Sequence, residues 1–319
     1  MVDTTLRPLN SKVYKYGGRN YFMAYNEIKE VRGRKYYYRV KSVKKHKKTA
    51  KERVYLGVNL TNEEIIKKAK EADKQLNLFE TFLTAEDIKF LETIKKEFSR
   101  EPKENYENRY ESFCSIFTYD STGIEGNTLT LSETSHLLFE GRVPSTRSLR
   151  EVNEVLNHKK AFDYLLTYNG ELTKEFILNL HYLVVLNTLR EDLVKHIGKY
   201  RKVQVFIGGS MPPNASEVPN LMTSLLRWYS MNKNKLNPLV LATYFHTEFE
   251  RIHPFVDGNG RVGRLLINFI LHKNNLPMIN IPKKRRFFYY EAIRRAHQGN
   301  YRPFIDLLIG LLKKEKLRF

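Results

Sequence analysis

The chain has 319 residues, and its 55 Lys or Arg against 35 Asp or Glu give a formal net charge of +20. This length suits one large domain or two domains that share a core. The single cysteine, Cys114, excludes an internal disulfide and a cysteine-rich metal site, and it favours a reducing, cytoplasmic setting. We expect neither a membrane span nor a secretory signal, because no apolar run approaches ~20 residues and no basic-then-apolar leader is present.

The positive charge is concentrated in the first 60 residues, which hold 16 Lys or Arg against 4 Asp or Glu. Such a field attracts acidic partners, nucleic acid or an anionic surface. The same region is rich in Tyr and Val and predicts a small β module. Its strands are expected at 11–16, 21–28, 35–43 and 53–58, with the basic segment 44–51 as an exposed connection.

Helical patterns dominate from residue 61 onward. Thr61 with Glu64 and Thr130 with Glu133 form capping boxes, which mark the starts of two helices. One long helix is expected over 84–109. Further helices are expected at 131–140, 149–168, 173–188, 218–232, 238–253, 260–273, 287–298 and 302–314.

One segment interrupts the helical pattern. Residues 200–207 alternate in polarity and end at Gly208-Gly209, which predicts a β-hairpin. The predicted fold class is therefore mainly α, with a β-hairpin and a small N-terminal β module. Its expected divisions are 1–60, a basic β-rich module; 61–110, a helical segment; and 111–319, the main helical domain.

The residues best suited to chemistry lie in one loop. Asp257 to Gly260 precede a helical pattern, and free N–H groups at a helix N-terminus bind phosphate well. Arg261 and Arg264 lie three apart on one helix face, and guanidinium groups bind phosphate in bidentate fashion. Asp257 offers a hard oxygen ligand for Mg²⁺. His253 can take a proton from an incoming hydroxyl near neutral pH.

This loop resembles the signature of the Fic family, His-x-Phe-x-Asp/Glu-Gly-Asn-Gly-Arg-x-x-Arg. Every fixed position is matched, by His253, Phe255, Asp257, Gly258, Asn259, Gly260, Arg261 and Arg264. The resemblance extends over roughly residues 110–312. It includes the helix before the loop (His246, Phe249, Ile252), a flap-like segment (198–208) and the segment expected near adenine (289–292).

The resemblance implies a Fic-type helical core that transfers AMP from ATP to a Ser, Thr or Tyr hydroxyl of a target protein. His253 would be the general base, and Asp257 would hold Mg²⁺ on the α- and β-phosphates. Phe255 would anchor the loop in the core. The implied nucleotide contacts are Gly258, Asn259, Gly260, Arg261, Arg264 and Tyr290. The implied target-binding flap edge is Lys202, Val203, Gln204, Val205 and Phe206.

A second motif, at residues 121–126, resembles the inhibitory pattern Ser/Thr-x-x-x-Glu-Gly/Asn of the self-inhibited Fic class. It is supplied here by Ser121 and Glu125. A Glu125 carboxylate paired with Arg264 would take that arginine away from the γ-phosphate, so ATP would bind in a pose unsuited to in-line attack. In some relatives the same glutamate helps to remove AMP from the target, which leaves that activity open for this chain.

Two other functions compete with AMP transfer. His246, Glu250 and His253 fall at i, i+4 and i+7, the pattern of a zinc hydrolase, although Pro254 suggests that the helix ends first. Residues 32–53 hold 11 Lys or Arg around a run of tyrosines, which favours nucleic-acid binding and can coexist with the enzyme. The sequence leaves pairing with a second copy of the chain open.

Overall fold

A computed structural model describes residues 15–16, 19–20, 25–31, 33–45, 48–75, 82–100, 102, 106–207 and 211–316. The chain divides into two compact units, Met1–Phe82 and Leu83–Phe319. The main expected border, at residue 60, lies inside the first unit, and the border at 110 lies inside the second. Within the described ranges, no helix is both long and apolar enough to cross a membrane.

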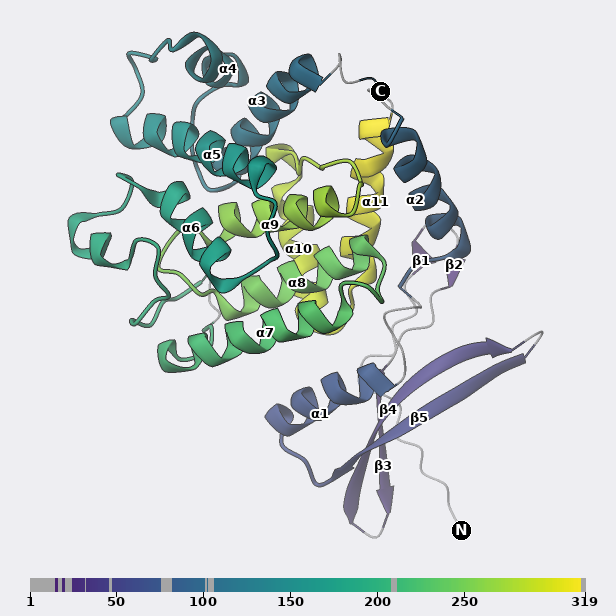
Figure 1. Ribbon diagram of the computed structural model, residues 1–319. Coiled ribbons are helices and arrows are strands. Elements are labelled where there is room, and N and C mark those ends of the chain that lie inside the picture. The colour runs from purple at the N-terminus through teal and green to yellow at the C-terminus, as the bar shows by residue number, and fades with distance from the viewer. Residues whose placement is uncertain are drawn as a thin grey trace. The chain divides into compact units, whose positions relative to one another are not determined.

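The first unit is a small antiparallel sheet with one helix packed on it (Figure 1). Its elements are β1 (Lys15–Tyr16), β2 (Arg19–Asn20), β3 (Tyr25–Val31), β4 (Arg34–Lys45), β5 (Lys48–Val58) and α1 (Asn62–Gln75). Strands β3, β4 and β5 are ordered as in the sequence, and β1 pairs with β2. Tyr37 and Leu56 pack on Ala69 and Ala72 of α1 to form the core of this unit.

The prediction of an exposed basic connection at 44–51 is wrong for most of that segment. The ladder between β4 and β5 continues to the pair Lys45 and Lys48, so most of this segment is strand. Main-chain hydrogen bonds can form whatever the side chain. A run of lysines therefore did not end the strands.

The second unit is built around two adjacent helices. It contains α2 (Ala85–Phe98), α3 (Tyr106–Ile124), α4 (Leu131–Glu140), α5 (Leu149–Thr167), α6 (Lys174–Val185), α7 (Val218–Asn232), α8 (Pro238–Ile252), α9 (Asn259–Lys273), α10 (Arg286–His297) and α11 (Arg302–Lys316), with short 3₁₀ helices at Glu191–His196, Ala215–Glu217 and Lys283–Arg285. Helix α9 contacts α3, α5 and α6, and α8 contacts α7, α10 and α11 (Figure 1). The loop joining α8 to α9 is therefore held by helices on both sides. The mainly helical fold class is confirmed.

The single helix expected over 84–109 is two helices, α2 and α3. Pro102 falls between them, and proline has no N–H to continue a helix and clashes with the preceding turn. Helix α3 begins after this break, runs to Ile124 and packs against α9. It therefore carries Ser121 in its last turn.

The β-hairpin expected over 200–207 does not form in this structure. Residues 200–206 are irregular, and Ile207 makes an isolated bridge. The buried side chain of Arg201 donates to the carbonyl oxygens of Val203 and Pro213, and Gln204 Nε2 donates to that of Pro212. Side chains thus satisfy carbonyls that a strand ladder would otherwise use.

Asp87 joins the first turn of α2 to α11 and predicts a pH-dependent loss of stability. Its carboxylate accepts from Thr84 N at 2.8 Å and from Arg302 at 2.7 Å. Burial acts to raise the pKa of Asp87, but the bonds from Arg302 and Thr84 outweigh it, and the pKa is lowered. A lowered carboxyl pKa contributes stability above the unfolded value that is lost as the pH falls.

We expect Asp87→Asn to lower the free energy of unfolding at pH 7 by about 1–3 kcal/mol, because it removes a charge-assisted bond at a partly buried site. The difference from wild type should begin to shrink below about pH 4, where the carboxyl is protonated in the unfolded chain, and should keep shrinking as the pH falls through the lowered pKa of folded Asp87. Urea unfolding at a series of pH values measures this difference. A loss of equal size at every pH would contradict the role given to the charge.

Candidate functional site

The loop between α8 and α9 is closed by its own residues. Helix α8 ends because His253 adopts φ 50°, and α9 begins after Gly258 at φ 80°. Phe255 is fully buried and anchors the loop in the core. Asn259 Oδ1 accepts from Phe255 N and its Nδ2 donates to Phe255 O, both at 2.9 Å. In this structure the side chain of Asn259 therefore locks the loop, and its expected contact with phosphate stays a prediction.

Two glycines of the loop are required by space. A Cβ on Gly258 would lie 2.7 Å from Val185 Cγ1, and the positive φ already disfavours other residues there. A Cβ on Gly260 would overlap Glu125 Oε1 and lie 3.0 Å from Arg264 Nη1. Gly260 therefore leaves open the space in which the glutamate and the arginine meet.

A buried histidine outside the signature supports the loop from α6. His181 stacks on Phe255, with ring centroids 3.7 Å apart and planes 1° from parallel. Burial lowers the pKa of His181 to about 3, so the ring is neutral at pH 7. Its Nδ1 accepts from Gly198 N at 3.1 Å, which leaves Nε2 to donate to Asp257 O at 3.2 Å. This ring therefore joins the segment at Gly198 to the loop between α8 and α9.

Arg201 makes a second link between the flap segment and the loop. Its backbone N donates to Pro254 O at 2.8 Å, and its Nε donates to His253 O at 2.8 Å. Its other nitrogens donate to the carbonyl oxygens of Ile252, Pro213 and Val203 and to Gln204 Oε1. One buried guanidinium thus gathers the backbone on both sides of the site.

His253 lies where it can accept a proton. Burial lowers the pKa of His253 to about 4, so the ring is neutral at neutral pH, as a general base must be. Glu250 Oε2 lies 3.9 Å from His253 Nδ1. Burial, with the nearby Glu125 charge, raises the pKa of Glu250 to about 8, so this carboxyl is mostly protonated at pH 7.

Arg264 is almost fully buried and is held by the two residues of the inhibitory motif. Its Nε donates to Ser121 Oγ at 3.0 Å, and its Nη2 donates to Ser121 O at 2.7 Å and to Glu125 Oε1 at 2.8 Å. Burial disfavours the charge, but the adjacent Glu125 carboxylate reverses this effect and raises the pKa of Arg264. The structure therefore brings together the three residues that the sequence placed more than a hundred positions apart.

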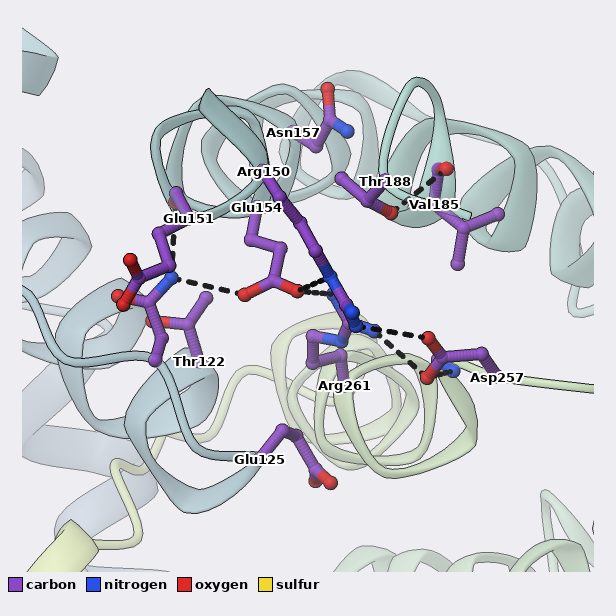
Figure 2. A network of polar contacts seen from close by, with 12 residues as sticks. Thr122, Glu125, Arg150, Glu151, Glu154, Asn157, Val185, Thr188, Asp257 and Arg261 are labelled. Carbon is purple, nitrogen blue, oxygen red and sulfur yellow. Dashed lines mark hydrogen bonds and ion pairs between the residues drawn. The ribbon is translucent and has the colours of Figure 1, made fainter. Parts of the chain in front are cut away.

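The second arginine, Arg261, lies between two carboxylates (Figure 2). Its Nη2 donates to Asp257 Oδ1 at 3.1 Å, and its Nη1 lies 3.9 Å from Glu154 Oε1. Arg150 joins the same two carboxylates from outside, at 3.1 Å from Glu154 and 3.7 Å from Asp257. Glu154 also accepts from Asn127, two residues after the inhibitory glutamate. The carboxylate expected to hold Mg²⁺ is thus paired with two cations here.

A cavity of about 370 Å³ opens beside Glu125, His253 and Arg264. Its lining includes residues of the loop signature, the Glu125 and Arg264 pair, both tyrosines of α10 and part of the segment expected to form the flap: His253, Gly260, Glu125, Arg264, Glu250, Tyr289, Tyr290, Ile207, Met211 and Pro212. Tyr289 is buried and bonds to His246 Nε2 at 2.7 Å, whereas Tyr290 is 45% exposed. Of the two rings, Tyr290 is therefore the more accessible to a ligand.

The flap residues Lys202–Phe206 directly precede the cavity-lining residue Ile207 in the chain, and their side chains differ in exposure. Phe206 is 76% exposed and Val203 is also exposed, but the Val203 carbonyl already accepts from Arg201. Gln204 is turned to the Pro212 carbonyl. In this conformation the expected edge over Lys202–Phe206 is irregular chain and forms no strand.

The zinc-hydrolase alternative is contradicted by the backbone. Helix α8 ends at Ile252, so His253 leaves the helix face that carries His246 and Glu250. His246 is bound to Tyr289 instead. Among the residues that the structure describes, no group of three His, Cys, Asp or Glu side chains could hold a metal ion.

The fold and the site agree with those of known proteins. The family model described as the Fic/DOC family matches residues 171–271. A Fic family protein from Desulfovibrio desulfuricans is 30% identical, with 73% of each chain covered and a TM-score of 0.59. A Fic domain containing signaling protein from Bacteroides thetaiotaomicron is 29% identical, with 70% of this chain and 93% of that chain covered and a TM-score of 0.63.

This chain therefore belongs to the Fic/DOC family, as the loop signature predicted. Among curated proteins, the protein adenylyltransferase Fic of Drosophila persimilis is 36% identical over 200 residues. That match covers 61% of this chain and 39% of the relative. The chain thus spans about two fifths of the length of the curated relatives it matches.

The signature misses several residues on which the site depends. His181, Arg201, Arg150 and Glu154 lie 52 or more positions before His253, so no local pattern joins them to the loop. The i, i+4 spacing of Arg150 and Glu154 predicts only a helix-surface pair. Their connection to Asp257 becomes visible once α5 packs against α9.

We expect Arg201→Ala to loosen the loop without unfolding the helices. Removal of a charged donor from several carbonyls should lower local protection by about 1.5–3 kcal/mol, or roughly 10–100-fold in amide exchange. Hydrogen exchange of residues 253–258 measures this effect. Arg201→Lys should recover only part of it, because a lysine cannot span the same carbonyls. Arg190→Ala, at an exposed arginine, serves as the control, and unchanged exchange in Arg201→Ala would contradict the anchoring role.

Proposed function

We propose that this chain transfers AMP from ATP to a hydroxyl side chain of a target protein. The observation that carries the proposal is that His253 is neutral and lines the same cavity as Arg264. Arg264 is a buried cation, and its carboxylate partner is Glu125. The name of the Drosophila relative, a protein adenylyltransferase, supports the same reaction. A phosphate-binding arginine and a base on one cavity are what an attack on a nucleotide phosphate requires.

In the proposed reaction, the target hydroxyl oxygen forms a bond to the α-phosphorus of ATP. The bond from that phosphorus to the α–β bridging oxygen breaks, and pyrophosphate leaves with the electron pair. His253 takes the hydroxyl proton, for which its low pKa keeps the ring unprotonated. Arg264 and Arg261 would stabilise the leaving phosphates, helped by free N–H groups at the start of α9.

The residues fit a magnesium ion carried by the nucleotide. Asp257 is the acidic side chain of the loop. It is partly exposed, and its carboxylate contacts Arg150, Arg261 and the backbone N of Gly258. One carboxylate together with substrate phosphates is a common way for proteins to hold Mg²⁺. When bound, the ion would neutralise phosphate charge. Asp257 would then exchange its contacts with Arg150 and Arg261 for the metal.

We further propose that Glu125 keeps the resting enzyme nearly silent. Its carboxylate occupies Arg264, so the γ-phosphate of ATP would have to compete with Glu125 for the same guanidinium. The exposed side of Glu125 lines the cavity and would also reach a water near a bound AMP group. Removal of AMP from a modified target stays a prediction that rests on this placement.

We expect Glu125→Gly to raise self-modification by labelled ATP about tenfold or more, because the competitor for Arg264 is lost. Transfer of label from [α-³²P]ATP to the chain measures the reaction. Glu191→Gly, at an exposed glutamate far from the cavity, should leave labelling unchanged. Equal labelling of wild type and Glu125→Gly would remove the inhibitory role from Glu125.

His253→Ala tests the transfer itself. Placed in the Glu125→Gly background, it should abolish labelling, because the target hydroxyl then loses its base. Nucleotide binding measured by calorimetry should persist, since the arginines are unchanged. Label that survives in the double variant would overturn the assigned base.

Three other expectations extend this proposal. The flap residues Lys202–Phe206 would hold the target backbone by pairing with it as a strand edge. Because these residues are irregular chain here, they would have to become a strand when the target binds. Pairing with a second copy of the chain is also proposed without a designated surface. A cytoplasmic site of action rests on Cys114, which is a free, buried thiol.

A further inference from the structure

The N-terminal sheet has one face under α1 and a second face that carries tyrosines. Tyr37 packs against α1. Its neighbours Tyr36 and Tyr38 point to the opposite side, because successive strand residues alternate. Tyr55 of β5 pairs with Tyr38 in the ladder and therefore lies on that same side. The sequence run of three tyrosines is thus divided by the strand into one core residue and two surface residues.

These three surface tyrosines form one cluster. The ring centroids of Tyr55 and Tyr38 lie 5.4 Å apart, and those of Tyr55 and Tyr36 lie 6.5 Å apart. Tyr55 is 52% exposed, and the other two rings are half-buried. Val40, the next residue on this side of β4, is fully buried. The accessible part of this face therefore ends before Val40 and lies toward the β3–β4 turn. Exposed aromatic rings on a sheet face offer a surface on which flat rings can stack.

Cations surround the tyrosine cluster. The Lys29 ammonium lies 5.7 Å from the centre of the Tyr38 ring. Arg34 precedes Tyr36 by two residues and is exposed on the same side. Arg53 lies on this side too, where it binds the carboxylate of Glu27 at 2.7 Å. Over residues 32–53, 11 Lys or Arg stand against one acidic residue. This charge complements a polyanion.

We propose that this sheet face binds single-stranded nucleic acid. Bases would stack on Tyr36, Tyr38 and Tyr55, while Lys29 and Arg34 would contact phosphates. A duplex fits less well, because its bases are stacked on one another and would leave the tyrosine faces unused. The inference concerns the first unit and stands apart from the AMP-transfer proposal, so either can fail alone. In the full chain, the bound strand would bring nucleic-acid-associated proteins near the transferase.

The test is fluorescence anisotropy of the full chain with labelled oligomers of about 12 units, a length suited to one small binding surface. The ligands are single-stranded RNA, single-stranded DNA, an abasic phosphodiester chain of the same length, and duplex DNA. We expect a base-bearing single strand to bind about tenfold or more tightly than the abasic chain. The two single strands distinguish RNA from DNA as the source. Equal binding to the abasic chain, or tighter binding to the duplex, would overturn the stacking mode.

Variants place the binding on the tyrosine face. Tyr55→Ala should weaken single-strand binding about tenfold, and Tyr55→Phe should retain it, because the ring is kept. Tyr182→Ala, at a tyrosine of α6 that is 47% exposed, is the matched control. Should Tyr55→Ala disturb the sheet by circular dichroism, Lys29→Ala with Arg34→Ala provides a second test, with a salt slope lower by about two. Unchanged binding in both sets of variants would exclude this face.

Discussion

The ion pair between Arg264 and Glu125 is the interaction on which the site depends. A guanidinium that is almost fully buried requires a paired and hydrogen-bonded environment. Ser121 in the last turn of α3 and Glu125 just after that helix supply it, from 143 and 139 residues away in sequence. The same contact fixes the end of α3 onto α9 and places a carboxylate over Gly260. One interaction therefore supports the end of α3 and also occupies part of the guanidinium that would bind phosphate under the proposed function.

The second arginine repeats this arrangement with weaker contacts. Arg261 is held by Asp257 and Glu154, and Glu154 also binds Asn127 just after the inhibitory glutamate. The carboxylate partners of both arginines are thus connected through one short stretch of chain.

The loop between α8 and α9 is held mainly by residues outside its signature. His181 stacks on Phe255, and Arg201 bonds to the backbone carbonyls of Ile252, His253 and Pro254. Both residues also belong to, or contact, the segment that leads into the flap. The geometry of the loop and the position of the flap segment are consequently coupled. The same side-chain bonds of Arg201 and Gln204 hold the flap segment as irregular chain, where alternation in the sequence suggested a hairpin.

The sequence by itself determined the residues of the phosphate loop, the inhibitory motif, the family and the mainly helical fold, because these follow from fixed local spacings and helical periodicity. It also indicated a basic, tyrosine-rich N-terminal module. Only the tertiary structure decided which partners each residue takes. Asn259 bonds inward to Phe255, Arg201 bonds to the carbonyl oxygen of His253, and the packing of α1 on the sheet buries Tyr37. Such outcomes depend on which distant elements pack together, and local patterns carry no information about that packing.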